Sequence, residues 1–393
     1  MTITLIADDL TGACDAGAHF SGRGRVGVFV DATRVDVTRA VAVVDTESRA
    51  LSPSEAGARV RAVARDLRAR IRAGFVFKKI DSTLRGPVTA EIEALLEVTG
   101  RPTALVCSSF PALGRTVTGG VLCVDGLPAH TSAIGRDPAY PGATSVVTDI
   151  LRRGAARPVR HLSLESVRGG SAALKAALRR AAGGIIAADA ETEADLDALA
   201  AAGIASPDVI LAGSAGLAQF VARHLGHAGS AAPMPGGRAW LIVAGSLHPV
   251  TRAQIHALEA AGVPGAVVDE RSEPDTRALA AELGEGRPVF LATADGDAPT
   301  AAARRGMAVA LAATAARLLE QARPDLVAVS GGDTAHALMG ALGADHIELT
   351  GAPASGLGLG ELVTRAARSL PWLSKAGGFG APDLFTALLE GTA

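Results

Sequence analysis

The regular alternation of short apolar runs with helical patterns limits this chain to a small set of folds. Residues 3–7 form an apolar run of strand length, and residues 13–20 follow with helical spacing. Further along, predicted strands at 184–188 and 209–212 enclose a predicted helix at 191–201. Such repeated alternation is typical of a mainly parallel sheet covered by helices on both faces. We therefore predict an α/β fold, in which ligands bind where the strands end.

The length of the chain and one low-complexity stretch predict two domains. At 393 residues the chain exceeds the usual size of a single core, and 48% hydrophobic residues suffice to fill two. Residues 226–237 are rich in Gly, Pro, Ala and Ser and lack a periodic pattern, which is typical of a linker. We expect domains at 1–225 and 238–393, each with a mainly parallel sheet flanked by helices.

Charge, aromatic content and cysteines narrow the function classes. Lys and Arg number 38 against 40 Asp and Glu, so the net charge of -2 gives no general attraction for nucleic acid or an anionic membrane. Aromatic residues make up only 3%, too few for base-stacking platforms. Residues 1–8 run directly into a strand and no run of about 18 apolar residues is present, so we expect neither a signal peptide nor a membrane span. The three widely spaced cysteines (Cys14, Cys107 and Cys123) are typical of reduced thiols and predict a cytoplasmic protein.

The segment 77–86, FKKIDSTLRG, concentrates cations, a carboxylate and hydroxyls in one turn. It lies between a predicted strand and a predicted helix at 88–96, where side chains from several crossovers of an α/β sheet converge. Lys79, Asp81, Ser82 and Arg85 are therefore candidates for binding an anionic, hydroxylated small molecule. The simpler alternative is a solvated basic loop with a Ser or Thr helix cap.

Two further predicted strands deliver charged residues to the same kind of edge. Asp8 and Asp9 follow the run 3–7, where adjacent carboxylates can orient a hydroxyl, accept its proton or hold a metal. We expect one of the two to cap the following helix instead. Arg49 follows the predicted strand 40–44, and its guanidinium could clamp a carboxylate, although a surface arginine is an equally good interpretation.

Four glycine-rich segments, predicted to be loops, concentrate in the second half of the chain. They lie at 245–248, 331–334, 351–360 and 377–380. The first two place glycines and hydroxyls before predicted helices, where backbone N–H groups and the helix dipole favour phosphate. The P-loop pattern, H-E-x-x-H and G-x-S-x-G are absent from the sequence, which excludes the commonest NTPase, metalloprotease and α/β-hydrolase classes.

Taken together, these motifs resemble the four-carbon acid sugar kinase family. The matching segments are ADDLTG at 7–12, DTESR at 45–49, KKIDSTLRG at 78–86, GSAGL at 213–217, GS at 245–246, SGGDT at 330–334 and GGFG at 377–380. They span nearly the whole chain in family order. The resemblance implies an ATP-dependent kinase that phosphorylates the terminal hydroxyl of a tetronate or 3-oxo-tetronate to give the 4-phosphate. It also implies that the first domain binds the sugar acid and the second binds ATP.

The same resemblance assigns site residues. By resemblance, the residues that bind ATP are Ser246, Gly331, Gly332, Asp333, Thr334 and Gly378. The residues that bind the sugar acid are Asp8, Asp9, Arg49, Lys79, Asp81, Ser82 and Arg85. One departure is Asp333, which replaces the glutamate common at that place and leaves the reach of the carboxylate to nucleotide or metal open.

The expected mechanism is transfer from MgATP by positioning and charge neutralisation. Lys79 and Arg85 would hold the substrate carboxylate or the transferring phosphoryl group, while Asp81 or Asp9 accepts the hydroxyl proton. The neighbouring Lys79, Ser82 and Arg85 should keep the carboxylate of Asp81 ionised, which favours it over Asp9. The metal ligands, the stereochemistry of the substrate and homo-oligomer formation are left open.

Two other function classes share a two-domain α/β layout. A nicotinamide-dependent dehydrogenase of hydroxy acids needs a glycine fingerprint between a strand and a helix, whereas Gly22, Gly24 and Gly27 lie between a predicted helix and a predicted strand. A solute-binding protein would carry an export signal and would need no second set of glycine-rich loops. Both are therefore less favoured than the kinase.

Overall fold

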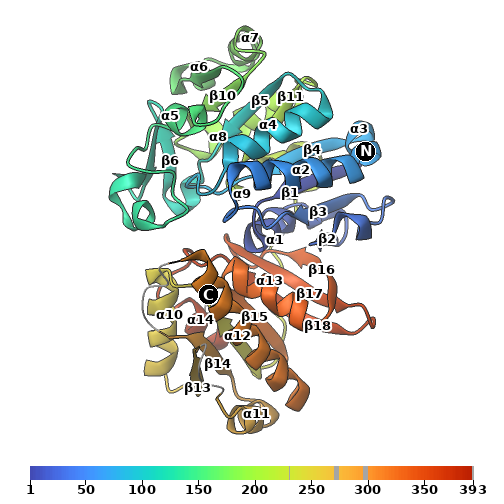
Figure 1. The fold of residues 1–393 in the computed structure, drawn as a ribbon, viewed down its shortest axis with the longest axis vertical. Helices are drawn as coiled ribbons and strands as arrows, with labels where there is room; N and C mark the ends of the chain where they lie inside the picture. Colours follow the sequence, from blue (N-terminus) through green and yellow to red (C-terminus); the bar gives the residue numbers. More distant parts are fainter. Residues whose placement is uncertain (230, 270–273, 295–299, 392–393) are drawn as a thin grey trace. The chain divides into compact units, whose positions relative to one another are not determined.

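The computed structural model describes residues 1–229, 231–269, 274–294 and 300–391. The chain divides into two compact units, Met1–Ser230 and Ala231–Ala393 (Figure 1). The division falls inside the stretch 226–237, in which Ser230 lies outside the described residues. No helix in the described part of the chain is both long and apolar enough to cross a membrane.

Unit 1 is built on an eight-stranded sheet in which every described pairing is parallel. In spatial order its strands are β2 (Val26–Phe29), β3 (Val41–Asp45), β1 (Ile3–Ala7), β4 (Phe75–Lys79), β11 (Val209–Gly213), β5 (Thr103–Cys107), β10 (Ile185–Ala188) and β9 (Val159–Leu162). The register sets Ala7 beside Asp45, and Ile6 beside Lys78. The residues that follow β1, β3 and β4 therefore emerge together at one edge of the sheet.

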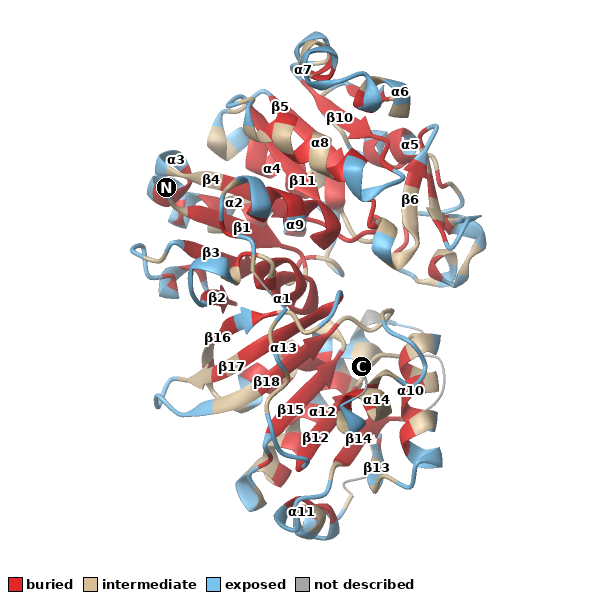
Figure 2. Ribbon diagram, turned by 180° about the vertical axis from the view of Figure 1, so that it is seen from behind, coloured by how far each residue is buried: buried red, intermediate tan, exposed pale blue. Residues whose placement is uncertain are grey.

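Two helical layers cover this sheet, and the faces of the helices that point away from it are the exposed ones (Figure 2). One layer contains α2 (Pro53–Asp66), α3 (Arg68–Ala73), α4 (Val88–Thr99) and α5 (Val147–Arg152). The other contains α1 (Leu10–Ala18), α6 (Leu164–Arg168), α7 (Ser171–Arg180), α8 (Glu193–Ile204) and α9 (Ala215–His224). Apolar side chains such as Ile6, Val60 and Ile92 form a continuous core under the first layer.

A small antiparallel sheet accompanies the main sheet of unit 1. It consists of β6 (Arg115–Thr118), β7 (Val121–Val124) and β8 (Leu127–Pro128). Asp125 and Gly126 connect β7 to β8 with φ angles of 50° and 80°, as a two-residue hairpin turn requires.

Unit 2 contains a seven-stranded mixed sheet. In spatial order its strands are β13 (Gly265–Val268), β14 (Val289–Thr293), β12 (Trp240–Ala244), β15 (Leu326–Ser330), β18 (Ser369–Lys375), β17 (Leu357–Thr364) and β16 (Ala344–Gly351). The pairs from β13 to β18 are parallel, whereas β17 is antiparallel to both β18 and β16. Ser330 pairs with Ala244 on one side and with Lys375 on the other, so the ends of β12, β15 and β18 lie side by side.

Helices also cover both faces of the second sheet. On one face lie α10 (Pro249–Ala260) and α14 (Leu384–Glu390), and on the other α11 (Arg277–Gly284), α12 (Ala301–Gln321) and α13 (Gly332–Ala341). Ile255, Leu258 and Phe385 join Ile242 and Leu373 of the sheet in an apolar core. The predicted α/β class, with mainly parallel sheets flanked by helices, is confirmed.

One local prediction was wrong in part. The third glycine-rich segment is a loop only in its middle, because Gly351 ends β16 and β17 begins at Leu357 and includes Gly358 and Gly360. A Cβ at residue 360 would clash with the carbonyl oxygen of Glu348 on β16, so glycine there permits a close backbone approach. The helix α2, which follows the capping box at Ser52, is separated from α3 at Leu67.

Candidate functional site

The carboxylates after β1 take two different positions. Asp9 is the N-cap of α1, and its Oδ1 accepts a hydrogen bond from the backbone N–H of Gly12 at 3.1 Å. Its Oδ2 accepts from the hydroxyl of Thr11 at 2.8 Å. Asp8 is only 2% exposed and faces the strand edge. The expectation that one of the two caps the helix holds, and the capping residue is Asp9 rather than Asp8.

Arg49 connects these two carboxylates. Its Nε donates to Asp8 Oδ2 at 2.7 Å, and its Nη2 donates to Asp9 Oδ1 at 2.6 Å. The same Nη2 lies 3.6 Å from Asp81 Oδ2. Burial disfavours the charged forms of both Arg49 and Asp8, but the attraction between the two charges outweighs this effect. The pKa of Arg49 is therefore raised and the pKa of Asp8 is lowered. The charges of Lys79 and Lys78 also lower the pKa of Asp8. Arg49 is therefore part of the cluster rather than a surface arginine.

The turn after β4 is organised around Asp81. Arg85 binds its carboxylate with two nitrogens, Nε to Oδ1 at 3.1 Å and Nη2 to Oδ2 at 2.7 Å. Thr83 adds its hydroxyl and its backbone N–H to Oδ1. Burial would raise the pKa of Asp81, but the charges of Arg85 and Arg49 and the bonds from Arg85 and Thr83 hold it well below its usual range.

The third nitrogen of Arg85 reaches a residue that the sequence did not single out. Its Nη1 donates to Asp137 Oδ2 at 2.9 Å, and nearby the backbone N–H of Gly86 donates to the carbonyl of Ala139 at 2.9 Å. Leu84 and Gly86 reverse the chain here with φ angles of 59° and 89°. The segment around Asp137, whose relation to the site could not be derived from sequence spacing, thus belongs to the same cluster.

Four groups in this cluster are available to a ligand. Within the described part of the chain, Lys79 Nζ donates only to the carbonyl of Ile80, at 2.9 Å, and Ser82 makes no hydrogen bond. Nη1 of Arg49 and the buried Oδ1 of Asp8 likewise have no partner among those residues. Glycine at position 12 lets the side chains of Asp9 and Lys79 approach the start of α1, because a Cβ there would clash with Asp9 and lie 2.7 Å from the Lys79 ammonium.

A buried ion pair lies beside these groups. Lys78 is 0% exposed, and its Nζ lies 2.8 Å from Glu91 Oε2 on α4. The hydroxyl of Ser48 donates to the other Glu91 oxygen at 2.6 Å and lies 2.7 Å from the hydroxyl of Thr46. Burial raises the pKa of Glu91 despite the charge of Lys78. The sequence pattern missed this pair; a carboxylate on an otherwise apolar helical face at position 91 is the signal that could have revealed it.

In unit 2, the glycine turns after β12, β15 and β18 meet. A Cβ at Gly377 would clash with the hydroxyl of Ser246, and one at Gly331 would lie 3.3 Å from the backbone nitrogen of Ser246. A Cβ at Gly378 would lie 3.2 Å from Nε2 of His248, which caps α10 by accepting from the N–H of Val250. Glycine at these positions therefore lets the turns pack closely beside the N-termini of α10 and α13.

The other residues assigned to ATP from the sequence lie at the start of α13. Gly332 begins this helix, and Asp333 is an exposed residue in its first turn. Thr334 is buried, and its hydroxyl occupies the place that a Cβ of Gly245 would need. Asp333 and Thr334 thus point in different directions, although they are adjacent in the sequence.

Lys375 is the residue of this region that the sequence did not reveal. It ends β18, two residues before the glycine turn 377–378, and is 0% exposed. Its Nζ donates to the carbonyls of Ala376 and Gly377 at 3.0 and 3.3 Å, and to the hydroxyls of Ser330 and Thr251 at 3.3 and 3.4 Å. Burial lowers the pKa of Lys375 to about 7. A lysine two residues before a glycine pair was the available signal.

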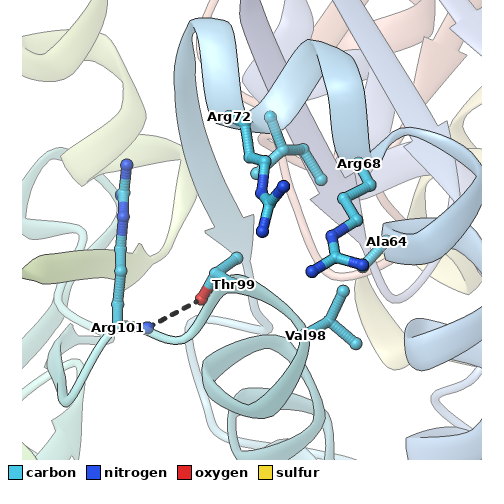
Figure 3. A pocket seen from close by; sticks show the side chains of 7 residues that line it. Ala64, Arg68, Arg72, Val98, Thr99 and Arg101 are labelled. Carbon is cyan, nitrogen blue, oxygen red and sulfur yellow. Dashed lines mark hydrogen bonds between the residues drawn. The ribbon is translucent and has the colours of Figure 1, made fainter.

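A separate hollow of about 160 Å³ lies away from both clusters (Figure 3). Its lining includes Arg68 and Arg72, whose side chains extend from α3 toward the end of α4, and Arg101 before the first residue of β5. It therefore opens at the amino end of β5, opposite the strand ends that carry the candidate residues. None of the residues predicted for the site lines it.

No group of three or more His, Cys, Asp or Glu side chains with the arrangement of a metal site occurs among the residues that the structure describes. The adjacent carboxylates of Asp8 and Asp9 are bound to Arg49 instead.

Comparison with known proteins agrees with this two-part arrangement. A family model described as a sugar-binding N-terminal domain matches residues 3–221, and one described as a nucleotide-binding C-terminal domain matches residues 241–385. The chain is 32% identical to the D-threonate kinase of Salmonella typhimurium (strain LT2), over 97% of this chain and 96% of the relative. It is 31% identical to the 3-oxo-tetronate kinase of Methylobacterium radiotolerans, over 99% of both chains.

A solved structure confirms the fold at lower sequence similarity. The crystal structure of a Salmonella typhimurium LT2 protein, described as a tRNA synthase, superposes with a TM-score of 0.79 at 22% identity, over 98% of both chains. At that identity the likeness concerns the fold alone. The two family models and the full-length identity to curated kinases carry the functional conclusion: the chain belongs to the four-carbon acid sugar kinase family and is a sugar-acid kinase.

Proposed function

We propose that the protein transfers the γ-phosphoryl group of ATP to the terminal hydroxyl of a four-carbon sugar acid, a tetronate or 3-oxo-tetronate, and so forms the 4-phosphate. One observation in unit 1 carries the choice of substrate. Four groups are available to a ligand at one strand edge: cationic donors on Lys79 and Arg49, the hydroxyl of Ser82 and the buried Oδ1 of Asp8. Two cationic donors beside a free carboxylate oxygen suit a ligand that carries both a carboxylate and hydroxyls.

The donors and acceptors divide between the two ends of such a ligand. Lys79 Nζ and Arg49 Nη1 would bind the substrate carboxylate, because the other nitrogens of Arg49 are occupied by Asp8 and Asp9. Asp8 Oδ1 would accept a hydrogen bond from a substrate hydroxyl, and Ser82 would bind a second oxygen. Arg85 is fully engaged by Asp81 and Asp137, so its role would be to hold the turn in place.

The geometry favours Asp9 over Asp81 as the group that accepts the proton, in contrast to the preference drawn from the sequence. Asp81 receives two nitrogens of Arg85 and two donors of Thr83, and such an anion is a weak base. Oδ2 of Asp9 accepts only from the hydroxyl of Thr11 among the described residues. That oxygen retains a lone pair for the hydroxyl of a bound substrate.

Unit 2 would bind the nucleotide, with residues 238–393 as the nucleotide domain and 1–225 as the sugar-acid domain. The turns at Ser246, Gly331 and Gly378 lie beside the N-termini of α10 and α13, where a Cβ at either glycine would press against Ser246 or His248. Backbone N–H groups at such helix N-termini bind phosphate oxygens. Transfer would then require the γ-phosphate held by one domain to reach the hydroxyl held by the other.

Mg²⁺ would enter with the nucleotide. Mg²⁺ in kinases commonly keeps several waters and binds one or two carboxylates together with phosphate oxygens, so no protein cage is needed. Asp333, in the first turn of α13, is the carboxylate placed to contribute a ligand. The metal would neutralise phosphate charge.

An ATP-consumption assay over D- and L-threonate, D- and L-erythronate and their 3-oxo forms tests the reaction. We expect turnover with at least one of these acids and none with NAD in place of ATP. A second test divides the chain: a folded 238–393 fragment should gain thermal stability from ATP, and a 1–230 fragment should not. Stabilisation of the 1–230 fragment by ATP, with no effect on the other, would reverse the domain roles.

A further inference from the structure

The environment of Lys375 is unusual because all of its contacts are neutral. Four oxygens surround its ammonium, two from the backbone carbonyls of Ala376 and Gly377 and two from the hydroxyls of Ser330 and Thr251. The ring of Phe385 lies 5.9 Å from Nζ. No carboxylate among the described residues forms an ion pair with it. A buried cation without an opposite charge is strongly disfavoured unless an anion is supplied from elsewhere.

The contacts of Lys375 also connect the three strand ends that would receive the nucleotide. Ser330 ends β15, Thr251 lies in the first turn of α10 after β12, and Gly377 belongs to the turn after β18. The hydroxyl of Thr251 additionally donates to the carbonyl of Gly377 at 2.7 Å. Lys375 therefore fixes the turn in which Gly377 packs directly against Ser246.

Other charged or titratable groups approach the same turns from neighbouring elements. Nε2 of His248 would lie 3.2 Å from a Cβ at Gly378, and Asp333 occupies the first turn of α13. Arg252 on α10 donates from Nη2 to the carbonyl of Ser246 at 3.1 Å. None of the three contacts the Lys375 ammonium, whose pKa is lowered to about 7 by burial alone.

We propose that Lys375 is the positioning residue of the nucleotide site, where its buried ammonium holds the Gly377 turn and is neutralised by the phosphate chain of the nucleotide. The inference rests on the proposed function of unit 2. Lys375 acts through the Gly377 turn, which it holds by hydrogen bonds, and through its charge, which a low-dielectric surrounding screens weakly. The ligand class is therefore a polyphosphate, and recognition strength rises with phosphate charge.

Proton uptake follows from this arrangement. A group whose proton is held more tightly in the complex gives an affinity that is high at low pH and is lost as pH rises from the pKa of the free protein toward the raised pKa of the complex. With a free pKa of about 7, binding at about pH 8 should take up close to one proton per nucleotide. Binding at about pH 6 should take up almost none.

Titration calorimetry of the full-length protein with a non-hydrolysable ATP analogue, in two buffers of different ionisation enthalpy, measures this number directly. The expected result is uptake that grows between about pH 6 and pH 8 in the wild type and disappears in Lys375→Met. The matched control is His248→Asn, which retains a side-chain oxygen for the helix cap and should keep the uptake. Affinity for the ATP analogue should fall about 10-fold to 100-fold in Lys375→Met, ADP less, and adenosine should be unaffected.

The outcomes separate the inference from the function on which it rests. Nucleotide binding by the wild type without proton uptake, or uptake that persists in Lys375→Met, would overturn the role of Lys375 and leave the kinase assignment standing. An equal loss of adenosine and ATP affinity in Lys375→Met would overturn it as well, because it would show a general structural defect. Absence of any nucleotide binding by the wild type would overturn both.

Discussion

Two buried lysines at strand ends, Lys78 in unit 1 and Lys375 in unit 2, have opposite electrostatic surroundings. Lys78 is compensated inside the protein by Glu91, whereas Lys375 contacts only neutral oxygens. The same contrast extends to the clusters around them. In unit 1, Arg49 and Arg85 are bound by the carboxylates of neighbouring turns, while the glycine turns of unit 2 border a single buried cation.

This contrast indicates how each unit is prepared for its ligand. A charge cluster that is already paired holds its side chains in place and leaves a few defined donors and acceptors, which suits the selection of a small hydroxy acid. An uncompensated buried cation instead favours whichever anion restores neutrality, which suits the phosphates of a nucleotide. The four predictions that follow test this difference, beginning with the largest expected effect.

Removal of the proton acceptor should affect unit 1 most severely. We expect Asp9→Asn to lower turnover by about 100-fold to 10,000-fold with both substrates still bound, because the amide cannot accept the proton but can still cap α1. Asp81→Asn should mainly weaken sugar-acid binding, because Arg85 loses its partner. Turnover at saturating substrate, together with calorimetric binding constants, distinguishes them. Near-normal turnover in Asp9→Asn, with a catalytically dead but binding-competent Asp81→Asn, would exchange the roles.

The same substitution at the two buried lysines should change stability in opposite directions. Lys78→Met leaves Glu91 buried without its cation and should lower the free energy of unfolding by about 3 to 5 kcal/mol. Lys375→Met removes an unpaired cation and should raise it, by up to about 5 kcal/mol near pH 6, since its pKa of about 7 lies far below the 10.5 of a free lysine. Urea unfolding of the ligand-free proteins measures both. Destabilisation of similar size in the two variants would contradict the comparison.

Substitution of the cations of unit 1 should change the binding or turnover of the sugar acid but not the binding of ATP. Arg49→Ala and Lys79→Ala should each weaken sugar-acid affinity or turnover on the order of 30-fold or more, because a buried charged group loses its partner, while ATP affinity stays nearly unchanged. The exposed Arg68 offers a matched control, since Arg68→Ala removes a guanidinium from unit 1 outside the cluster. Binding constants for both substrates test the assignment, and an ATP defect with normal sugar-acid binding would contradict it.

The last prediction concerns the pH dependence of the stability gain in Lys375→Met. The pKa of Lys375 is lower in the folded protein, so between about pH 7 and 10.5 the unfolded chain binds more protons, and wild-type stability rises with pH across this window. Below pH 7 both states are protonated and the full penalty is present. The difference in unfolding free energy between Lys375→Met and the wild type should therefore be greatest near pH 6 and should shrink steadily toward pH 10. A difference that does not change with pH would exclude Lys375 as its source.

Local motifs at strand ends were predictable from the sequence, whereas their long-range partners were not. Asp8, Asp9 and Asp81 follow apolar runs, and parallel strands bring their ends to one edge, so their clustering with Arg49 and Arg85 could be anticipated. Asp137 and Glu91 come from distant segments, and nothing in their local sequence specifies which loop or helix face they approach. Lys375 could not be predicted for another reason. Burial lowers its pKa, and burial depends on tertiary packing rather than on the local sequence.

Glycine was the residue type whose meaning was most dependent on context. Gly331 adopts a φ of 109° at the N-cap of α13, as a turn glycine should. Gly360 lies within β17, where the approach of the β16 backbone rather than a turn excludes a side chain. From the sequence, both glycines are predicted to lie in loops, because composition does not distinguish a glycine required by backbone conformation from one required by close packing.

The turn from Asp81 to Gly86 also has a consequence for the entropy of ligand binding. Arg85 bridges Asp81 and Asp137, and the N–H of Gly86 is bonded to the carbonyl of Ala139, so the turn is immobilised by the protein itself. Ordering a free backbone costs about 1 to 2 kcal/mol per residue, and a loop that is already fixed is exempt from that loss when it binds. A ligand with only four carbons offers few contacts, so its affinity depends on a small loss of conformational entropy in the protein on binding. The ion pairs of this turn thus contribute to binding without touching the ligand, by removing disorder in advance.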